Sequence, residues 1–350
     1  MARFLSFQNK VDSEIDSFLS ENVLGTPGQS MVYKQLKTSE KLNHIPNPTF
    51  MSLKKGNNLI GTSCFCSRPL SDYNSFYIRY FSFNAVYRRN TPHSSGQKKN
   101  SLIKEEVLDA LESESPFNLN ENPSIFYAYV DPNNERSRKL CAELGFKNVR
   151  SFSTITFSRF SPEKDKRIEK LKDDQKGEMR KLLNNQYSEY SFYTEENLFY
   201  KDGYFVIRNR SNEILAGVQA SLEKWDIREM PGFVGWITLN VLSKVPFLKR
   251  IINPNYRFIT LESIYLKNGN EQLLEGLLES VLSLFHVNVG LITADKQSNL
   301  YHNIKKLRLG PLNKLKKEVG ADIIVKSSQS SMSLSNFHDK PCFISTLDLA

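Results

Sequence analysis

One arrangement of elements occurs twice along this chain of 350 residues. In the first half, the apolar run "SIFYAYV" leads into Asp131, a short helical segment that ends at Gly145, and another strand. In the second half, "VGLITAD" ends at Asp295 and leads into a short helical segment that ends at Gly310, and then into "GADIIVK". The Asp and Gly positions are 14 residues apart in the first copy and 15 in the second. Because identity between the copies is low, the prediction of a divergent tandem repeat depends on this order of elements.

Hydrophobic periodicity predicts the remaining elements of each copy. The first copy has a helix at 9–21, a hairpin at 48–68, a long aromatic strand at 75–87 and a helix at 100–113, which Asn100 or Ser101 would cap. The second has strands at 203–209, 213–225 and 257–266 and a helix at 270–285. A charged segment from Ser161 to Leu182 is predicted to link them. The expected fold is therefore α/β (mixed α+β), with two domains at 1–160 and 161–350.

Composition and sequence pattern indicate where in the cell such a chain is found. No apolar run reaches the 18 or so residues that a membrane span requires, and the first residues lack the pattern of a secretory signal. We therefore expect a cytoplasmic protein with no membrane partner. Its cysteines show no metal-binding spacing, so we expect no metal site and four reduced structural thiols, at Cys64, Cys66, Cys141 and Cys342.

The net charge of +9 is spread over both halves, which does not favour a nucleic-acid partner over a small anionic ligand. One local cluster is more informative. Between Tyr73 and Lys104 there is no acidic residue, whereas arginines and lysines recur through the window. We therefore expect any anion site to lie in this part of the first half.

The residues that follow Asp131 resemble a motif of the GNAT N-acetyltransferases. Members of that family carry N-x-x-S/A-x-x-L-Y after their fifth strand, with G-F close behind. The matching positions here are Asn134, Ser137, Leu140, Cys141, Gly145 and Phe146. In physical terms, Asn134 can cap the helix, Gly145 can end it in a left-handed turn, and Phe146 can enter the core. The resemblance implies two tandem GNAT-like domains, each with a mixed central sheet flanked by helices.

The same resemblance implies an acetyl-CoA site in the first domain. In the family, a loop of the form Q/R-x-x-G-x-G/A before the next helix wraps the pyrophosphate, and amides at a helix start suit phosphate oxygens. With Gln97 in the first position, Asn100 and Leu102 stand where the glycines are expected, so the fingerprint is degenerate. The candidate cofactor-binding residues are Gly96, Gln97, Lys98, Lys99, Asn100 and Ser101, together with Asn134. The alternative is a solvated basic loop.

Two residues are candidates for catalysis. Where the family often has a tyrosine acid, this chain has Cys141, which is either a weak acid or a packing residue. Glu262 lies in the otherwise apolar strand "FITLESIYL" and is either a general base or a partner in a structural ion pair. Tyrosines between 187 and 204 either line an amine-binding cleft or cover the second sheet.

The leading hypothesis is an N-acetyltransferase that moves an acetyl group from acetyl-CoA to a small-molecule or peptide amine by direct attack. In this view the first domain holds CoA and the second shapes the acceptor cleft. One alternative is a noncatalytic module that binds acyl-CoA or a partner, and another is aminoacyl transfer from charged tRNA. Neither the acceptor nor the oligomeric state follows from the sequence.

Overall fold

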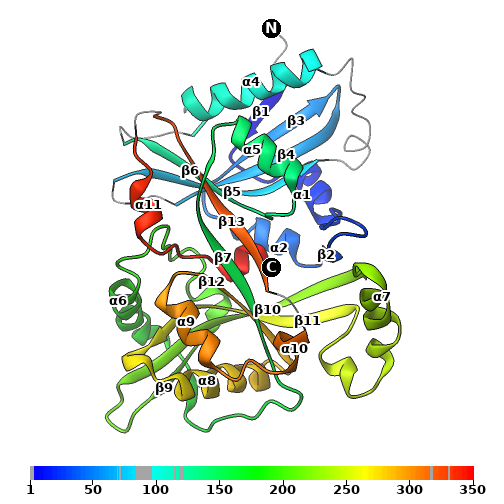
Figure 1. The fold of residues 1–350 in the computed structure, drawn as a ribbon. Coiled ribbons are helices and arrows are strands. Elements are labelled where there is room, and N and C mark those ends of the chain that lie inside the picture. Colours follow the sequence, from blue (N-terminus) through cyan, green and yellow to red (C-terminus); the bar gives the residue numbers. More distant parts are fainter. Residues whose placement is uncertain are drawn as a thin grey trace. The chain divides into compact units, whose positions relative to one another are not determined.

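The computed structural model describes residues 4–68, 70, 72–83, 97–113, 116–117, 122–315, 318–329 and 332–350. Its chain forms two compact units (Figure 1). The first contains residues 1–22, 38–150 and 321–339, and the second contains 23–37, 151–320 and 340–350. The passage at 150–151 lies near the boundary expected after 160, but each unit also takes a short segment from the other half of the sequence.

The first unit is built on a mixed sheet. Its strands are β1 (Leu5–Gln8), β3 (Pro48–Lys55), β4 (Asn58–Ser67), β5 (Asn74–Phe83), β6 (Ser124–Val130) and β13 (Val319–Ser327), in that spatial order. Its helices are α1 (Ser13–Ser20), α2 (Thr38–Leu42), α4 (Gln97–Ser113), α5 (Glu135–Glu143) and α11 (Ser335–Asp339). Neighbouring strands are antiparallel except β5 and β6, which are parallel.

The second unit repeats this plan. Its sheet has the order β7 (Lys147–Ser158), β12 (Val289–Asp295), β11 (Asn255–Leu266), β10 (Ile214–Glu229), β9 (Tyr204–Arg208) and β8 (Ile168–Lys170), and β2 (Val32–Gln35) also pairs with β10. Only β11 and β12 are parallel. Its helices are α6 (Lys176–Gln186), α7 (Gly232–Asn240), α8 (Glu271–Leu284), α9 (Asn299–Lys306), α10 (Pro311–Leu315) and α12 (Thr346–Leu349). Its described residues also form the 3-10 turns η1 (Asp173–Gln175), η2 (Tyr200–Asp202), η3 (Leu242–Lys244), η4 (Leu248–Arg250) and η5 (Lys267–Gly269).

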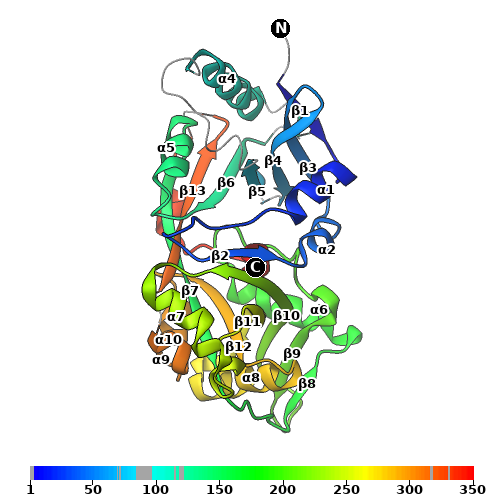
Figure 2. The same cartoon turned by 90° about the vertical axis from the view of Figure 1, so that its right-hand side faces the viewer.

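Each sheet includes a strand from the opposite half of the sequence. In the first unit, β13 pairs with β6 from Asp322↔Val130 to Ser327↔Ile125, and Figure 2 shows the two strands side by side. In the second, β7 pairs with β12 from Val289↔Ser158 to Asp295↔Phe152. A strand edge with unpaired backbone groups is thereby covered in both units.

The predicted repeat is visible in matching hydrogen bonds. After β6, the Asp131 carboxylate accepts from the Asn133 backbone N–H at 2.9 Å, and after β12 the Asp295 carboxylate accepts from the Gln297 N–H at the same distance. Asn134 then caps α5 by accepting from the Ser137 N–H at 3.0 Å. Ser298 caps α9 by accepting from the Tyr301 N–H at 3.1 Å. Both segments end at a left-handed glycine, Gly145 with φ +86° and Gly310 with φ +90°.

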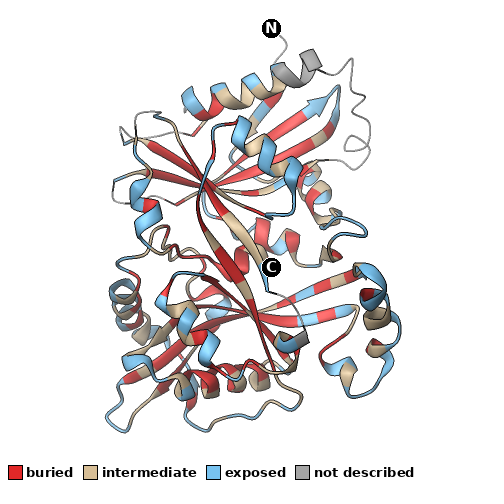
Figure 3. Ribbon diagram, in the orientation of Figure 1, coloured by how far each residue is buried: buried red, intermediate tan, exposed pale blue. Residues whose placement is uncertain are grey.

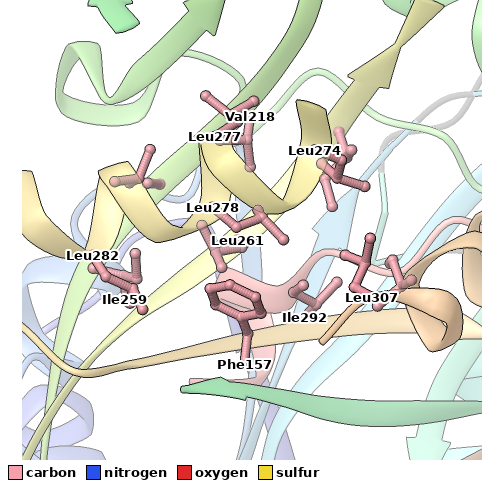
Figure 4. Packing of buried hydrophobic residues seen from close by; sticks show 14 of the residues in the cluster. Phe157, Val218, Ile259, Leu261, Leu274, Leu277, Leu278, Leu282, Ile292 and Leu307 are labelled. Carbon is pink, nitrogen blue, oxygen red and sulfur yellow. The ribbon is translucent and has the colours of Figure 1, made fainter. Parts of the chain in front are cut away.

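The helices cover these sheets with the faces that periodicity predicts. In the second unit, α8 buries Leu274, Leu277, Leu278, Val281 and Leu282 completely against β10, β11 and β12 (Figure 4). In the first, α4 and α5 pack their apolar sides on one core, which includes Phe76, Phe126, Leu144 and Phe146. Burial of this kind contributes roughly 2 kcal/mol for each large apolar side chain. Figure 3 shows the buried strands beneath exposed helix surfaces.

Three local expectations differ from the structure. The charged segment at 161–182 is not a plain linker, because it contains β8 and the start of α6, which buries only Met179 and Leu183. Helix α4 begins at Gln97 rather than at Asn100 or Ser101. Strands β1 and β2 and helix α7 were not expected, because four-residue strands and a helix without charged residues give weak periodic signals.

Within the described residues, no helix is both long enough and apolar enough to cross a bilayer.

We predict that the two halves cannot fold separately. A fragment of residues 1–160 retains β6 but lacks β13, so the β6 edge and the core beside it are exposed. Expressed alone, it should show no cooperative thermal unfolding by circular dichroism. The same fragment with residues 319–339 fused through a flexible linker should regain a cooperative transition. Cooperative unfolding of the unfused fragment would contradict this prediction.

Candidate functional site

The parallel strand pair of the second unit separates after a short contact. Strands β11 and β12 pair only from Ile259↔Gly290 to Leu261↔Ile292. Just beyond, Ser263 has φ +46°, and two residues of β11 lie opposite one residue of β10, which is a β-bulge. Ligands of open α/β sheets bind where the carboxyl ends of parallel strands diverge. This divergence is therefore a place where a site can form.

The bulge is held by side chains from the tyrosine-rich segment. The Tyr204 hydroxyl donates to the Ser263 carbonyl at 2.9 Å, and the Tyr187 hydroxyl donates to the Ile264 carbonyl at 2.9 Å. The Gln186 amide also donates to the Ile264 carbonyl. Burial raises the pKa of Tyr187 and of Tyr204 well above the ordinary tyrosine value, so both hydroxyls remain donors. These two tyrosines therefore brace the sheet.

The carboxyl-terminal segment, residues 340–350, fills the space between the separated strands. The Thr346 hydroxyl donates to the Leu261 carbonyl on β11 at 3.0 Å and shares a 2.8 Å hydrogen bond with the Thr293 hydroxyl on β12. The Thr293 N–H also donates to Thr346 Oγ1 at 3.2 Å. Asp295 accepts from the Cys342 N–H at 2.8 Å. The segment thus bonds to both strands where they no longer bond to each other.

Glu262 belongs to this same cluster. Its side chain is 5% exposed, and its Oε2 accepts from the Ser345 hydroxyl at 2.8 Å and from the Leu347 N–H at 2.9 Å. Asn197, also buried, donates to Ser345 Oγ at 2.8 Å and to the Asp348 carboxylate at 3.0 Å. Glu262, an acidic residue in an otherwise apolar strand, therefore holds the carboxyl-terminal segment in place. A small cavity beside it is lined by Glu262, Asp295, Ser298 and Cys342.

The first unit has the same separation of parallel strands. Strands β5 and β6 pair from Asn74↔Ser124 to Tyr77↔Tyr127, and Tyr80 then has φ +57° at a bulge opposite β4. Its surroundings differ from those in the second unit. Past the last pair, Arg79 and Val130 are buried, whereas Tyr80 and Tyr129 are partly exposed and Phe81 is 46% exposed.

The corresponding strand ends of the second unit are buried. This holds for Glu262, Ser263 and Ile264 on β11 and for Thr293, Ala294 and Asp295 on β12. Both units thus have a parallel strand pair that separates at a β-bulge, but solvent reaches the strand ends more readily in the first unit.

The predicted pyrophosphate-binding residues lie at the start of α4. Gln97, Lys98, Lys99 and Asn100 form its first turn, Ser101 follows, and that turn contains no acidic residue. Gly96 lies outside the described residues. Helix α4 comes next in the chain after β5, so its amino-terminal amides follow the strand that diverges from β6.

Asn134 and Cys141 share α5 in the first unit. The Asn134 side chain is engaged as the helix cap. Cys141 is half-buried and packs against the apolar core, and burial raises the pKa of its thiol from 9.0 to about 11. A thiol with so high a pKa is a weaker acid than an ordinary cysteine. These contacts support a packing role for Cys141.

The predicted site residues are therefore divided between the units, with Glu262 in the second and the others in the first. Sequence reasoning missed the bulges at Tyr80 and Ser263 and the contacts of Asn197, Ser345 and Thr346. No local pattern marks the last three, because their partners lie 53 to 151 positions away in the chain. For the bulges, a polar or aromatic residue after a parallel run is too common a pattern to be diagnostic.

Comparison with solved structures places the fold. Saccharomyces cerevisiae N-myristoyltransferase with bound myristoyl-CoA superposes with a TM-score of 0.57 at 10% identity, covering 93% of this chain and 83% of that one. A second crystal structure of the yeast enzyme with bound myristoyl-CoA gives 0.56 at 10% identity, with 93% and 79% covered. A GCN5-related N-acetyltransferase from Sphaerobacter thermophilus gives 0.48 at 10% identity, with 85% and 88% covered. No family model and no curated protein matches the sequence. The chain has a GNAT-like fold, as the sequence motif predicted.

We predict that the hydroxyl of Thr346 fixes the carboxyl-terminal segment. The isosteric change Thr346→Val leaves the Leu261 carbonyl and the Thr293 N–H without this partner, which should lower the free energy of unfolding by about 2 kcal/mol. Loosening of the segment should also make Cys342, now 1% exposed, react faster with iodoacetamide. The matched control is Thr238→Val, whose hydroxyl bonds at the surface and should cost less than about 0.5 kcal/mol. Equal stability and equal Cys342 protection in both variants would refute the prediction.

We also predict the pH dependence of Cys141. Alkylation follows the thiolate, so labelling of Cys141 by iodoacetamide should reach half its maximal rate near pH 11 rather than near 9. The folded state binds this proton more tightly than the unfolded state. The stability that Cys141→Ser removes is therefore present below pH 9 and lost as the pH rises through about 11. Mass spectrometry of the labelled peptide measures the first effect, and a midpoint near 9 would disprove it.

Proposed function

We propose that the protein is an acyl-CoA-dependent N-acyltransferase whose first unit binds the acyl-CoA. The observation that carries this proposal is the contrast between the two strand divergences. In the second unit, the carboxyl-terminal segment occupies the divergence, with Thr346 bonded to both strands. In the first unit, the corresponding strand ends at Tyr80, Phe81 and Tyr129 are accessible to solvent. In the resembled family the pantetheine arm lies between these two strands, and the greater exposure of the strand ends in the first unit favours binding there.

Helix α4 supports the same assignment. The amino terminus of a helix carries partial positive charge, and the 17 residues of α4 form a full helix with Lys98 and Lys99 in its first turn. Phosphate oxygens are stabilised by such a terminus together with nearby cations. We therefore propose that Gln97, Lys98, Lys99, Asn100 and Ser101 bind the pyrophosphate of the acyl-CoA, with Gly96 before them. Asn134 also stays a candidate cofactor-binding residue, and its side chain caps α5.

The proposed reaction is direct transfer. The amine nitrogen of the acceptor attacks the thioester carbonyl, a C–N bond forms and the C–S bond breaks. The nitrogen loses a proton to a base, and the departing thiolate takes up a proton. The roles of Glu262 as base and Cys141 as acid stay predictions. The contacts of Glu262 with Ser345 and Leu347 favour a positioning role, in which its carboxylate fixes the segment that closes the second unit. In this proposal the second unit shapes the acceptor cleft.

The acyl chain is a separate part of the proposal. The sequence resemblance favours acetyl-CoA, whereas the yeast structures of similar fold contain bound myristoyl-CoA. We propose acetyl-CoA as the donor and a small-molecule or peptide amine as the acceptor. A titration with acetyl-, octanoyl- and myristoyl-CoA separates the chain lengths by their relative affinities.

A second candidate function is binding of acyl-CoA without turnover. Two observations favour it: Asn100 and Leu102 replace the expected glycines, and burial weakens Cys141 as an acid. Release of free CoA over a panel of amines, measured with a thiol reagent, distinguishes the two functions once acyl-CoA binding has been shown.

We predict that acyl-CoA raises the melting temperature. At about 100 times its Kd, a ligand adds about 2.7 kcal/mol to the free energy of unfolding. Lys98→Ala with Lys99→Ala should weaken binding about tenfold, because two cations near the phosphates are lost. The matched control, Lys164→Ala with Lys166→Ala, removes two exposed lysines from the second unit and should leave binding unchanged. The absence of any shift at millimolar acyl-CoA would count against the proposal.

A further inference from the structure

A segment at one end of the β10–β11 hairpin exposes an unusual amount of apolar surface. We call residues 232–250, which include α7, η3 and η4, the apolar cap (Figure 1). Its Phe233, Val234 and Trp236 side chains are 75%, 76% and 55% exposed. Among the described residues, six of the ten large apolar side chains with high exposure belong to the cap; the other three are Val241, Val245 and Phe247. Scattered exposed apolar residues are normal, but a concentration of this kind marks an interaction surface.

The exposed side of the cap is distinct from the side that holds it to the second unit. Leu239 and Leu242 pack inward on a core with Ile251, Ile252 and Trp225. Gly235 lies so close to Met230 that an added Cβ would be 2.6 Å from a backbone atom. Phe233 and Trp236, one helical turn apart, stack outward with ring planes 6° apart. The cap is therefore anchored by its inner side and presents a fixed aromatic outer side.

The charged residues within the apolar cap are all basic. From Met230 to Leu261 the sequence contains no acidic residue, whereas Lys244, Lys249, Arg250 and Arg257 are all exposed. Three of these cations lie within the cap, next to its apolar side chains. Helix α7 itself carries no charged residue at all. A helix that is apolar all round is normally buried in protein or in lipid.

We propose that the apolar cap docks on the surface of an anionic membrane. Tryptophan and phenylalanine insert at the boundary between headgroups and acyl chains, and lysine and arginine beside them bind anionic headgroups. The cap combines both features and lacks the acidic residues that would repel such a surface. The earlier expectation of no membrane partner depended on the lack of a spanning run, and a helix that lies on a surface needs no such run.

The test uses the full chain and the fluorescence of Trp236. The protein has two tryptophans, and Trp225 is only 8% exposed, so a change at the surface reports on Trp236. Vesicles of phosphatidylcholine with about 30% phosphatidylserine should shift the emission to shorter wavelength and should co-sediment with the protein. Vesicles of phosphatidylcholine alone should bind at least about tenfold more weakly. High salt should reduce binding to the anionic vesicles.

Two variants separate the apolar and the cationic contributions. Phe233→Ser with Val234→Ser should abolish sedimentation with vesicles, and Lys244→Glu with Lys249→Glu should weaken it more than about twentyfold. Since all four side chains are exposed, the melting temperature should stay within about 2 °C of the wild type. Matched controls outside the cap are Val319→Ser and Lys164→Glu with Lys166→Glu, which should bind as the wild type does.

Three results would overturn the proposal. They are no binding to anionic vesicles, equal binding by the cap variants and the wild type, and a concentration-dependent dimer in sedimentation velocity that the Phe233→Ser, Val234→Ser variant abolishes. The third result would identify a second copy of the chain as the occupant. Acyl-CoA binding is measured separately, so failure here leaves the proposed function untouched.

Discussion

The structure depends on a parallel pair of strands that stops early. In each unit, two neighbouring strands share only three or four register pairs before a β-bulge turns one of them away. A bulge at Tyr80 or Ser263 costs energy, because a side chain with positive φ is strained and ladder hydrogen bonds are lost. In the second unit, Tyr187 and Tyr204 offset part of that cost by donating to the carbonyls that the bulge releases. In the second unit, the separation of the two strands is therefore stabilised by these hydrogen bonds.

The separation of the two strands leaves backbone groups without a partner on the neighbouring strand. In the second unit, the carboxyl-terminal segment fills the space between the strands with Thr346, which replaces the missing hydrogen bonds between strands with bonds to itself. Buried Glu262, Asn197 and Asp295 then hold the rest of that segment. This closure of the second unit is the physical reason for the proposal that acyl-CoA binds to the first unit. The carboxyl-terminal segment thus closes the strand divergence of the second unit, whereas part of the divergence in the first unit remains accessible to solvent.

The helix between Asp131 and Phe146 illustrates how much could be predicted. Its cap at Asn134, its left-handed end at Gly145 and the burial of Phe146 were expected and are confirmed, and α8 buries the leucines that its periodicity marked. All these features depend on neighbours within a few positions. The charged segment at 161–182 was predicted to be a linker because its few buried side chains, Ile168, Leu171 and Met179, stand among many charged residues. The proposed roles of Glu262 and Cys141 stay predictions, since a residue type in a strand or helix does not reveal its distant partners.

Sequence alone predicted a GNAT-like fold and determined the helix caps, the left-handed glycines and the buried face of α8, because caps, turns and hydrophobic periods are local properties of the chain. Tertiary structure decided the rest. It placed β13 in the first sheet and β7 in the second, brought residues 340–350 between β11 and β12, and left the aromatic side of α7 exposed. These outcomes depend on hydrogen bonds and packing between residues far apart in the chain. No short stretch of sequence contains both partners of such a contact.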